Sequence, residues 1–388
     1  MLSIRQGYIM IIERLNNLDE LLDLQQEFEI KNKIQILNVS DWSCSKDFRS
    51  ALLSSFHIQS NINKVDYKYS YSLSSDTISK IKSNYTFCNE KNDIMITPNN
   101  TVSIVYIANL LKQLNTRKIC ILAPAYFSVY SIFDLLEIPY ERISLSRKNG
   151  SFTINQEIDF REFDAMWVTS PIFCSGCSYD KDTLKILSAF SQYKTIVTDE
   201  SFCMLGDELP LKTHLQNHIG IYSPHKAIGF NSFKYSRIVY NLKYCSTLEQ
   251  WSDVLCGSLN ATNVDAINHF LSENYFECQK IYTEYINNAR EFVQNELEKY
   301  PFLSYDHNSK GNMIMIYLQS QKDYECFNIY NLNSLMENTM TTLLPGYLHD
   351  YDNKTECCFR VNLSRFDNRF RVLFPNMCLY LKSFTSAQ

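Results

Sequence analysis

Short apolar runs alternate with amphipathic segments through the middle of the chain. The apolar runs predict strands at residues 93–97, 118–123, 140–145, 165–169, 194–198, 218–222 and 236–241. The amphipathic segments predict helices at residues 101–113, 126–136 and 182–193. Strands that alternate with helices in this way favour a mostly parallel sheet covered by helices on both faces. The expected fold class is therefore α/β.

The two ends of the chain predict a second, smaller unit. Residues 15–31 are typical of an amphipathic helix, residues 34–38 of a short strand, and residues 41–56 of a loop followed by a helix. A long helical stretch, continuous or broken, covers residues 263–300, and strands follow at 313–318 and 357–363. We expect a large domain over residues 46–270 and a small α+β domain built from residues 1–45 and 271–388.

Composition narrows the class of protein. The chain has 388 residues, of which 45% are hydrophobic, and this is enough apolar material for two lobes. The net charge of −5 implies no basic face, which argues against nucleic acid or an anionic membrane as a partner. Residues 1–16 lack the apolar run of a signal peptide, and no stretch is long enough to cross a bilayer. We therefore expect a cytoplasmic protein.

The cysteines do not form a recognisable framework. There are 13 of them, an odd number, without the regular spacing of a disulfide scaffold. Cys174 and Cys177 form a CxxC pair, which zinc sites and redox motifs share. No second pair completes a set of four zinc ligands, so we expect no metal site and reduced cysteines instead.

Polar side chains follow the predicted strands, at the edge where such sheets bind ligands. Asn99, Asn100 and Thr101 open a helix after the first strand, and they either bind an anion with the helix N-terminus or cap the helix. Tyr126 follows the second strand and either stacks on a planar ring or packs in the core. Asp199 follows the fifth strand. A buried carboxylate there needs a partner, such as a protonated pyridine nitrogen, a helix cap or a lysine.

One segment carries two lysines around a turn. Lys226 lies shortly after Ser223, and Lys234 follows eight positions later, with a Gly/Asn/Ser run between the lysines. The Lys226 amine could form an imine with an aldehyde cofactor whose phosphate Ser223 and Lys234 hold, although a solvated loop is the simpler reading. Arg360 lies inside an apolar strand, where an unpaired guanidinium is costly. We expect it to meet a ligand carboxylate or a structural salt bridge.

In this order, the segments resemble the fold-type I, pyridoxal-phosphate-dependent aminotransferases of class I/II. The resemblance covers about residues 34–380, and Pro345-Gly346 also fits the family's pattern. It implies a large cofactor-binding domain, a small domain made from both chain ends, and a homodimer with shared active sites. In such a dimer, Tyr67, Tyr69 or Tyr71 could cross between subunits.

The resemblance also implies roles for individual residues. Lys226, in Ser-Pro-His-Lys, is similar to the lysine that forms the internal aldimine with pyridoxal 5'-phosphate. Asp199, in Asp-Glu-Ser-Phe, matches the aspartate that pairs with the pyridine nitrogen, and Arg360, in Phe-Arg-Val-Asn, resembles the arginine that grips the substrate carboxylate. Matches to the ring-stacking aromatic and the phosphate ligands are Tyr126, Asn99, Asn100, Thr101, Ser223 and Lys234.

The chain departs from the family at two cofactor contacts. Phe173 stands where the family has an asparagine that hydrogen-bonds the phenolic oxygen of the cofactor, and Phe202 stands where a tyrosine contacts the same oxygen. Such donors stabilise the phenolate and lower the pKa of the imine. We therefore expect the imine to stay protonated to higher pH, unless Ser170, Cys174 or His225 substitutes.

These observations predict an aminotransferase of amino-acid metabolism that acts on an amino acid. Two other functions remain open. The first is a non-transaminating enzyme with the same cofactor: a decarboxylase, a cyclising or eliminating lyase, or an amino-acid oxidase. It would need the same lysine, aspartate and arginine, and the altered contacts to the phenolic oxygen favour it. The second is a binding or regulatory protein that has lost catalysis.

Overall fold

The computed structural model describes residues 14–55, 79–80, 92–154, 158–204, 215, 217–231, 234–255, 267–319, 326–351 and 357–385. The tyrosine-rich segment with Tyr67, Tyr69 and Tyr71 lies outside the described residues. The prediction that these tyrosines reach a second subunit therefore stays a prediction.

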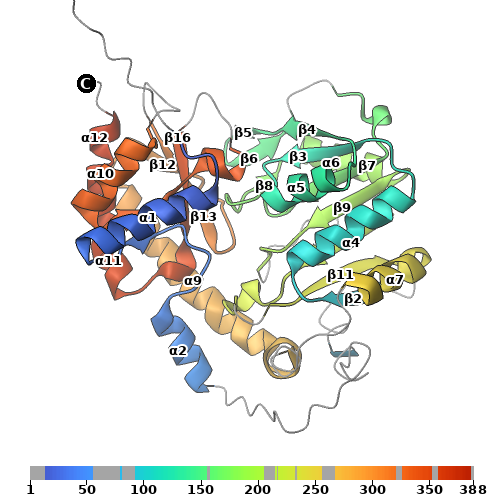
Figure 1. Ribbon diagram of the computed structural model, residues 1–388, viewed down its shortest axis with the longest axis horizontal. Helices are drawn as coiled ribbons and strands as arrows, with labels where there is room; N and C mark the ends of the chain where they lie inside the picture. The colour runs from blue at the N-terminus through green and yellow to red at the C-terminus, as the bar shows by residue number, and fades with distance from the viewer. Residues whose placement is uncertain are drawn as a thin grey trace, which may run out of the picture.

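A seven-stranded sheet forms the centre of the larger lobe (Figure 1). Its strands, in spatial order, are β2 (Asn92–Thr97), β11 (Ser236–Asn241), β10 (His218–Tyr222), β9 (Thr195–Asp199), β7 (Ala165–Thr169), β3 (Ile119–Ala123) and β4 (Tyr140–Ser144). β11 runs antiparallel to both of its neighbours, and the other pairs are parallel. The predicted mostly parallel sheet is confirmed.

Helices cover both faces of this sheet. Along β3, the side chains of Ile119 and Ile121 enter one apolar cluster, whereas those of Cys120 and Leu122 enter another. This alternation is the period of two expected of a strand buried on both faces. The first face is covered by α4 (Asn100–Gln113), α5 (Phe127–Leu135) and α7 (Cys245–Leu255). The second face is covered by α6 (Lys181–Ser191), α2 (Lys46–Ser55) and α9 (Tyr275–Leu297).

The smaller lobe contains a four-stranded antiparallel sheet. Its order is β12 (Leu303–Tyr305), β13 (Met313–Leu318), β16 (Cys357–Asn362) and β15 (Leu344–Pro345). The N-terminal strand β1 (Leu37–Asn38) pairs in parallel with β14 (Thr341–Thr342), so segments from both ends of the chain meet here. The same lobe holds the helices α1 (Leu18–Asn32), α10 (Ile329–Thr339), α11 (Asn368–Tyr380) and α12 (Lys382–Thr385) (Figure 1).

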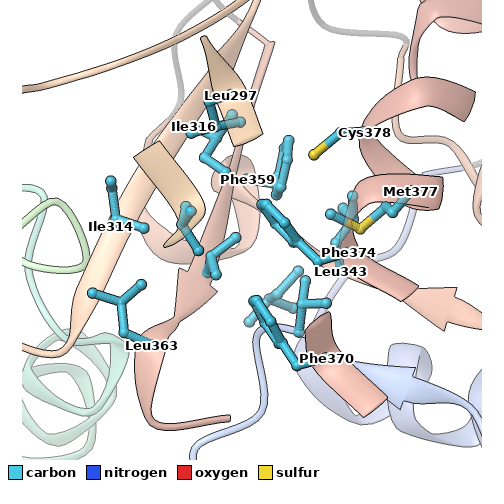
Figure 2. Packing of buried hydrophobic residues seen from close by; sticks show 14 of the residues in the cluster. Leu297, Ile314, Ile316, Leu343, Phe359, Leu363, Phe370, Phe374, Met377 and Cys378 are labelled. Carbon is cyan, nitrogen blue, oxygen red and sulfur yellow. The ribbon is translucent and has the colours of Figure 1, made fainter. Parts of the chain in front are cut away.

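A hydrophobic core of aliphatic and aromatic side chains holds the smaller lobe together (Figure 2). Phe370 and Phe374 of α11 stack with centroids 4.9 Å apart, and Phe359 of β16 lies fully buried in the same cluster. Burial of one such side chain contributes about 1.5–3 kcal/mol. This packing fixes β16, and β16 carries Arg360 on its opposite face.

α9 runs from the smaller lobe to the underside of the larger one (Figure 1). A π-helical segment, Ile267–Glu273, precedes it, so the predicted helical stretch is broken near Asn274. Smaller elements that we did not predict are β5 (Ser146–Lys148), β6 (Ser151–Thr153), β8 (Ser178–Tyr179) and the 3₁₀ turns Phe160–Glu162, Lys226–Ile228, Leu242–Tyr244, Gly346–His349 and Leu363–Arg365.

One carboxylate joins the two lobes. Asp350, directly after the 3₁₀ turn of the smaller lobe, accepts hydrogen bonds from the Tyr130 hydroxyl and from the Ala125 N–H at 3.1 Å. Its other oxygen accepts from Arg142 Nε of β4 at 2.5 Å. These contacts fix the smaller lobe against the edge of the large sheet.

Candidate active site

Lys226 lies in a tight turn beyond the carboxyl end of β10. The N–H of Lys226 donates to the Ser223 carbonyl at 2.9 Å, which closes the turn. Gly229 ends the turn with a φ of 75°, a conformation that glycine adopts without strain. A Cβ there would also lie 3.0 Å from the ring of Tyr282. The sequence therefore places Lys226 on a short, fixed loop at the ligand edge of the sheet.

The amine of Lys226 faces a cavity. Its Nζ lies 4.0 Å from the ring centroid of Phe202. Burial lowers the pKa of Lys226 from its ordinary value to about 8, an effect that Asp199 opposes and Lys234 reinforces. The amine is therefore neutral more often near neutral pH than an exposed lysine amine, and the neutral form is the nucleophile.

Asp199 lies at the end of β9, beside the strand that leads to Lys226. It is buried, and its carboxylate accepts hydrogen bonds from the Ser201 N–H at 3.1 Å and from Asn100 Nδ2 at 3.5 Å. It forms no salt bridge with any residue that the structure describes. A buried carboxylate with neutral partners alone is costly, so the surroundings favour a cationic ligand atom.

A cavity of about 640 Å³ brings most of the predicted site residues together. Those that line it are Lys226, Asn99, Asn100, Thr101, Tyr126, Phe202 and Lys234. Asp199 does not line the cavity itself but accepts a hydrogen bond from Asn100, which does. The remaining predicted residues, Ser223, Phe173 and Arg360, do not line the cavity. The structure therefore gathers most of the sequence-based site around a single space.

The N-terminus of α4 opens onto this cavity. The Asn99 side chain caps the helix by accepting from the Val102 N–H at 3.0 Å, so the capping alternative is correct for Asn99. The Asn100 side-chain oxygen is buried without a hydrogen-bond partner among the described residues, and as an acceptor it adds nothing to an anion site. The positive end of the helix dipole and Lys234, which lines the same cavity, make this end of the cavity suit an anion.

Ser223, a predicted phosphate ligand, is not among the residues that line the cavity. Its hydroxyl is buried and shares a hydrogen bond of 2.8 Å with the Ser236 hydroxyl across the β10–β11 pair. The Ser223 hydroxyl could turn toward the cavity only if its hydrogen bond to Ser236 were broken. Its role as a phosphate ligand stays a prediction.

Arg360 points from β16 into the space between the lobes. It is fully buried and donates to the Ser40 carbonyl, while its other guanidinium nitrogen lies 3.7 Å from Cys174 Sγ. Its Nε has no hydrogen-bond partner, and burial lowers its pKa from the ordinary value. No carboxylate among the described residues forms a salt bridge with it, so the anion that we expected for it does not come from this part of the chain.

A cluster of aromatic side chains packs around Trp42 and Phe173 at the site. The Trp42 ring stacks on Phe202 at 5.6 Å and lies near Phe173 at 6.4 Å, and His349 meets Phe173 edge-on at 5.6 Å. Tyr126 also approaches Phe173, with centroids 5.9 Å apart. The two phenylalanines that replace polar residues of the family are thus part of one aromatic cluster, in which Phe202, Trp42 and Tyr126 line the cavity and Phe173 packs behind them.

A loop between the lobes holds Phe173 in place. The Phe173 carbonyl accepts a hydrogen bond from the Tyr351 hydroxyl, and the Ser175 carbonyl accepts from Ser309 Oγ at 2.6 Å. Gly176 has a φ of 70°, and a Cβ there would lie 1.9 Å from the Lys310 carbonyl oxygen. Only glycine allows this approach, so the small lobe positions the loop that carries Phe173.

Three residues were candidates for replacing the missing polar contacts. His225 lines the cavity, but burial lowers its pKa to about 3, and its Nδ1 is 2.6 Å from the Tyr235 carbonyl. Cys174 lies at Arg360, and burial raises its pKa to about 11. For Ser170, the structure shows a backbone N–H that donates to the Asp199 carbonyl.

Other residues at the site were not predicted from the sequence: Trp42, Arg49 and Asn231, which line the cavity, and His349, which packs against Trp42. Trp42 and Asn231 are joined by a hydrogen bond from the Asn231 side chain to the Trp42 carbonyl. A signal for Trp42 existed, because it follows the short strand predicted at 34–38, and residues after strands were our criterion elsewhere. Arg49 and His349 lie far from any such position, and only the tertiary structure brings them to the site.

The described residues hold no metal-binding cluster, no disulfide and no helix that could span a membrane. Among the described residues, no three His, Cys, Asp or Glu side chains gather closely enough to hold a metal ion. None of the described cysteines forms a disulfide. In the same part of the chain, no helix combines the length and the apolar character needed to span a bilayer.

Comparison with solved structures identifies the architecture. A PLP-dependent aminotransferase from Streptococcus suis superposes with a TM-score of 0.73 at 15% identity, over 95% of this chain and 98% of that one. A multiple substrate aminotransferase from Thermococcus profundus gives a TM-score of 0.70 at 15% identity, over 96% of each chain. This chain has the fold of the PLP-dependent aminotransferases.

The same fold also includes enzymes of other reaction types. The L-threonine-O-3-phosphate decarboxylase from Porphyromonas gingivalis matches with a TM-score of 0.64 at 15% identity, over 90% of this chain and all of that one. No protein-family model matches the sequence, and no curated protein matches it significantly. At this level of identity the fold is shared, and the reaction has to be argued from the site.

Proposed function

We propose that the protein is a pyridoxal-phosphate-dependent aminotransferase that acts on an amino acid. One observation carries the proposal. The amine of Lys226, with its lowered pKa, shares a cavity with Lys234, with the N-terminus of α4 and with the Asn100 side chain that contacts Asp199. An amine, an anion site and a buried carboxylate are the three groups that this cofactor requires.

The residues present fit the cofactor. Lys226 would hold its aldehyde carbon covalently, and the N-terminus of α4 with Lys234 would hold its phosphate. Asp199, buried and without an ion pair among the described residues, would hold the ring nitrogen in its protonated form. Tyr126 lines the cavity and would contact the ring.

The chemistry then divides between the cofactor and the protein. When bound, the cofactor supplies an electron sink for the α-carbon of an amino acid. Lys226 Nζ, with a pKa of about 8, is suited to accept a proton and to return it within the cavity. Asp199 would keep a positive charge at the ring nitrogen, and the aromatic cluster of Phe173, Phe202 and Trp42 would limit the access of water.

Arg360 would bind the substrate carboxylate. Its guanidinium is buried, with an unpartnered Nε and no carboxylate bound to it in the described part of the chain. A planar guanidinium binds a carboxylate through two parallel hydrogen bonds. Trp42 covers it in the present conformation, so binding requires this side chain to move.

A second candidate function is a non-transaminating enzyme with the same cofactor. The observation that favours it is the apolar pair Phe173 and Phe202, because both lack the polar group found in the family the sequence resembles. The decarboxylase from P. gingivalis shares the fold. The leading proposal includes a homodimer, a cytoplasmic location and a biosynthetic role.

The absorbance spectrum of the purified chain tests this proposal. The chain is incubated with pyridoxal phosphate and a panel of amino acids, with and without 2-oxoglutarate, and products are identified by mass spectrometry. Transamination predicts keto acid together with amine transfer to 2-oxoglutarate. Carbon dioxide, ammonia or peroxide would support the second candidate instead. A chain that gains no absorbance from the cofactor would be a binding protein without this chemistry.

A further inference from the structure

Arg49 lines the same cavity, and the proposed reaction assigns it no role. It belongs to α2, close to Phe48, whose ring lies near Gly229 at the end of the Lys226 turn. Leu52, one helical turn on, is buried in the cluster beneath the large sheet. This anchor fixes the face of α2, so Arg49 is directed into the cavity by the packing of its own helix.

The guanidinium of Arg49 has no partner among the residues that the structure describes. Within the described part of the chain its side chain forms no salt bridge and no hydrogen bond, and its Nε is buried and unsatisfied. A buried donor left without an acceptor costs about 1–3 kcal/mol, and more when it is charged. Such a group is retained more readily where a ligand supplies the missing acceptor.

Neighbouring groups do not neutralise Arg49. Asp41 lines the cavity but is engaged by Arg365, with 3.4 Å between Oδ2 and the guanidinium, and by the Ser43 hydroxyl at 2.5 Å. Burial raises the pKa of the Cys44 thiol to about 12, so this neighbour carries no charge at neutral pH. Lys234, which also lines the cavity, adds a second positive charge. The cavity therefore holds an excess of positive charge.

We propose that Arg49 binds an anionic group of a ligand in this cavity, either a phosphate or a carboxylate. A guanidinium fork matches both through two parallel hydrogen bonds. The inference rests on the proposed function, because that function supplies the anion. The anion is then the phosphate of the cofactor or the acidic side chain of a dicarboxylic substrate. The shared chemistry is an oxyanion that meets Arg49 in the cavity.

Calorimetric titration of the full chain tests this site without the cofactor. The probes are inorganic phosphate and 2-oxoglutarate, and the variants are Arg49→Gln, Arg49→Lys and, as a matched control, Lys46→Gln. Lys46 is an exposed cation on the same helix. The wild type is expected to bind at least one probe, and Arg49→Gln to weaken it about tenfold or more. Arg49→Lys is expected to weaken it less, and Lys46→Gln to leave it unchanged.

Two results would overturn the proposal: no binding of either probe by the wild type, or wild-type binding by Arg49→Gln. If Arg49→Gln does not fold, as judged by circular dichroism, undiminished binding by Arg49→Lys would overturn it, because the fork would then be unnecessary.

Two further titrations distinguish the sources of the anion. Weaker binding of pyridoxal phosphate but not of pyridoxal by Arg49→Gln identifies the cofactor phosphate. Weaker binding of L-glutamate but not of L-alanine identifies an acidic substrate. Failure of the wild type to bind pyridoxal phosphate would contradict the proposed function alone, since the calorimetry on Arg49 would stand.

Discussion

The guanidinium of Arg360 lies over the ring of Trp42, with 3.7 Å between Cζ and the ring centroid. Trp42 lines the cavity, whereas Arg360 is fully buried and does not. A carboxylate that enters the cavity therefore meets the indole before it meets the guanidinium. Because a cation–π contact in a desolvated site contributes about 2 kcal/mol, the carboxylate has to compete with Trp42 for Arg360.

Removal of the indole should strengthen carboxylate binding. In Trp42→Ala the guanidinium is uncovered, so the dissociation constant of a simple carboxylate such as propionate should fall about tenfold. Calorimetry on the cofactor-loaded chain measures this constant. Trp42→Phe keeps an aromatic face and should stay close to the wild type. Unchanged or weaker binding in Trp42→Ala would show that the indole does not compete with the ligand.

The pKa of Lys226 should move in opposite directions when its two charged neighbours are removed. Only the neutral amine reacts with an aldehyde, so trapping of pyridoxal at Lys226 should rise with pH through about 8. The Asp199 carboxylate stabilises the ammonium form, so Asp199→Asn should shift the midpoint to lower pH. Lys234 disfavours that form, so Lys234→Gln should shift it to higher pH. Borohydride reduction followed by peptide mass spectrometry gives each midpoint, and shifts of the same sign would refute this electrostatic picture.

A hydroxyl at position 202 should change the titration of the bound cofactor. Phe202 lies 4.0 Å from Lys226 Nζ and offers no hydrogen bond to the cofactor oxygen. In Phe202→Tyr a donor returns, and the imine pKa should fall by about one unit, the equivalent of one hydrogen bond to a charged group. An absorbance titration reads this value. Phe127→Tyr, at an exposed position, serves as the control. An equal pKa in the wild type and Phe202→Tyr would mean that another group already contacts the oxygen.

Loss of the Asp350 carboxylate should loosen the two lobes. In Asp350→Ala the Tyr130 hydroxyl, the Ala125 N–H and the Arg142 guanidinium lose their acceptor. We expect a loss of about 2–4 kcal/mol in the free energy of unfolding, measured with urea. Asp182→Ala removes an exposed pair with Lys185 and should cost less than about 0.5 kcal/mol. Similar costs for the two variants would show that Asp350 is no inter-lobe anchor.

Much of the fold follows from local patterns in the sequence. The strands of the large sheet and the helices between them have apolar periods that only a doubly covered sheet satisfies, and the structure confirms them. The strand pair that joins the chain ends, Leu37 with Thr341, could not be predicted in register, because two residues carry no period. The small strands and the C-terminal helices were missed for a related reason, since their apolar faces are set by the lobe around them.

The site divides in the same way. Residues directly after strands, such as Tyr126 and Asn100, could be found because strand ends converge at one edge of a sheet. The contact between the Arg360 guanidinium and the Trp42 ring could not be predicted, because it joins two segments that are distant in sequence and meet only when the lobes pack. Arg49 was not identified either, because a lone arginine on an amphipathic helix is usually solvated.

The most direct test of the account is the chemistry of one amine. The full chain is incubated with pyridoxal phosphate, reduced with borohydride, digested and examined by mass spectrometry, with Lys226→Ala in parallel. The account predicts a reduced phosphopyridoxyl group on the peptide that contains Lys226, and none on the remaining lysines of the variant. No adduct on the wild type, or an adduct on another lysine that persists in Lys226→Ala, would contradict it.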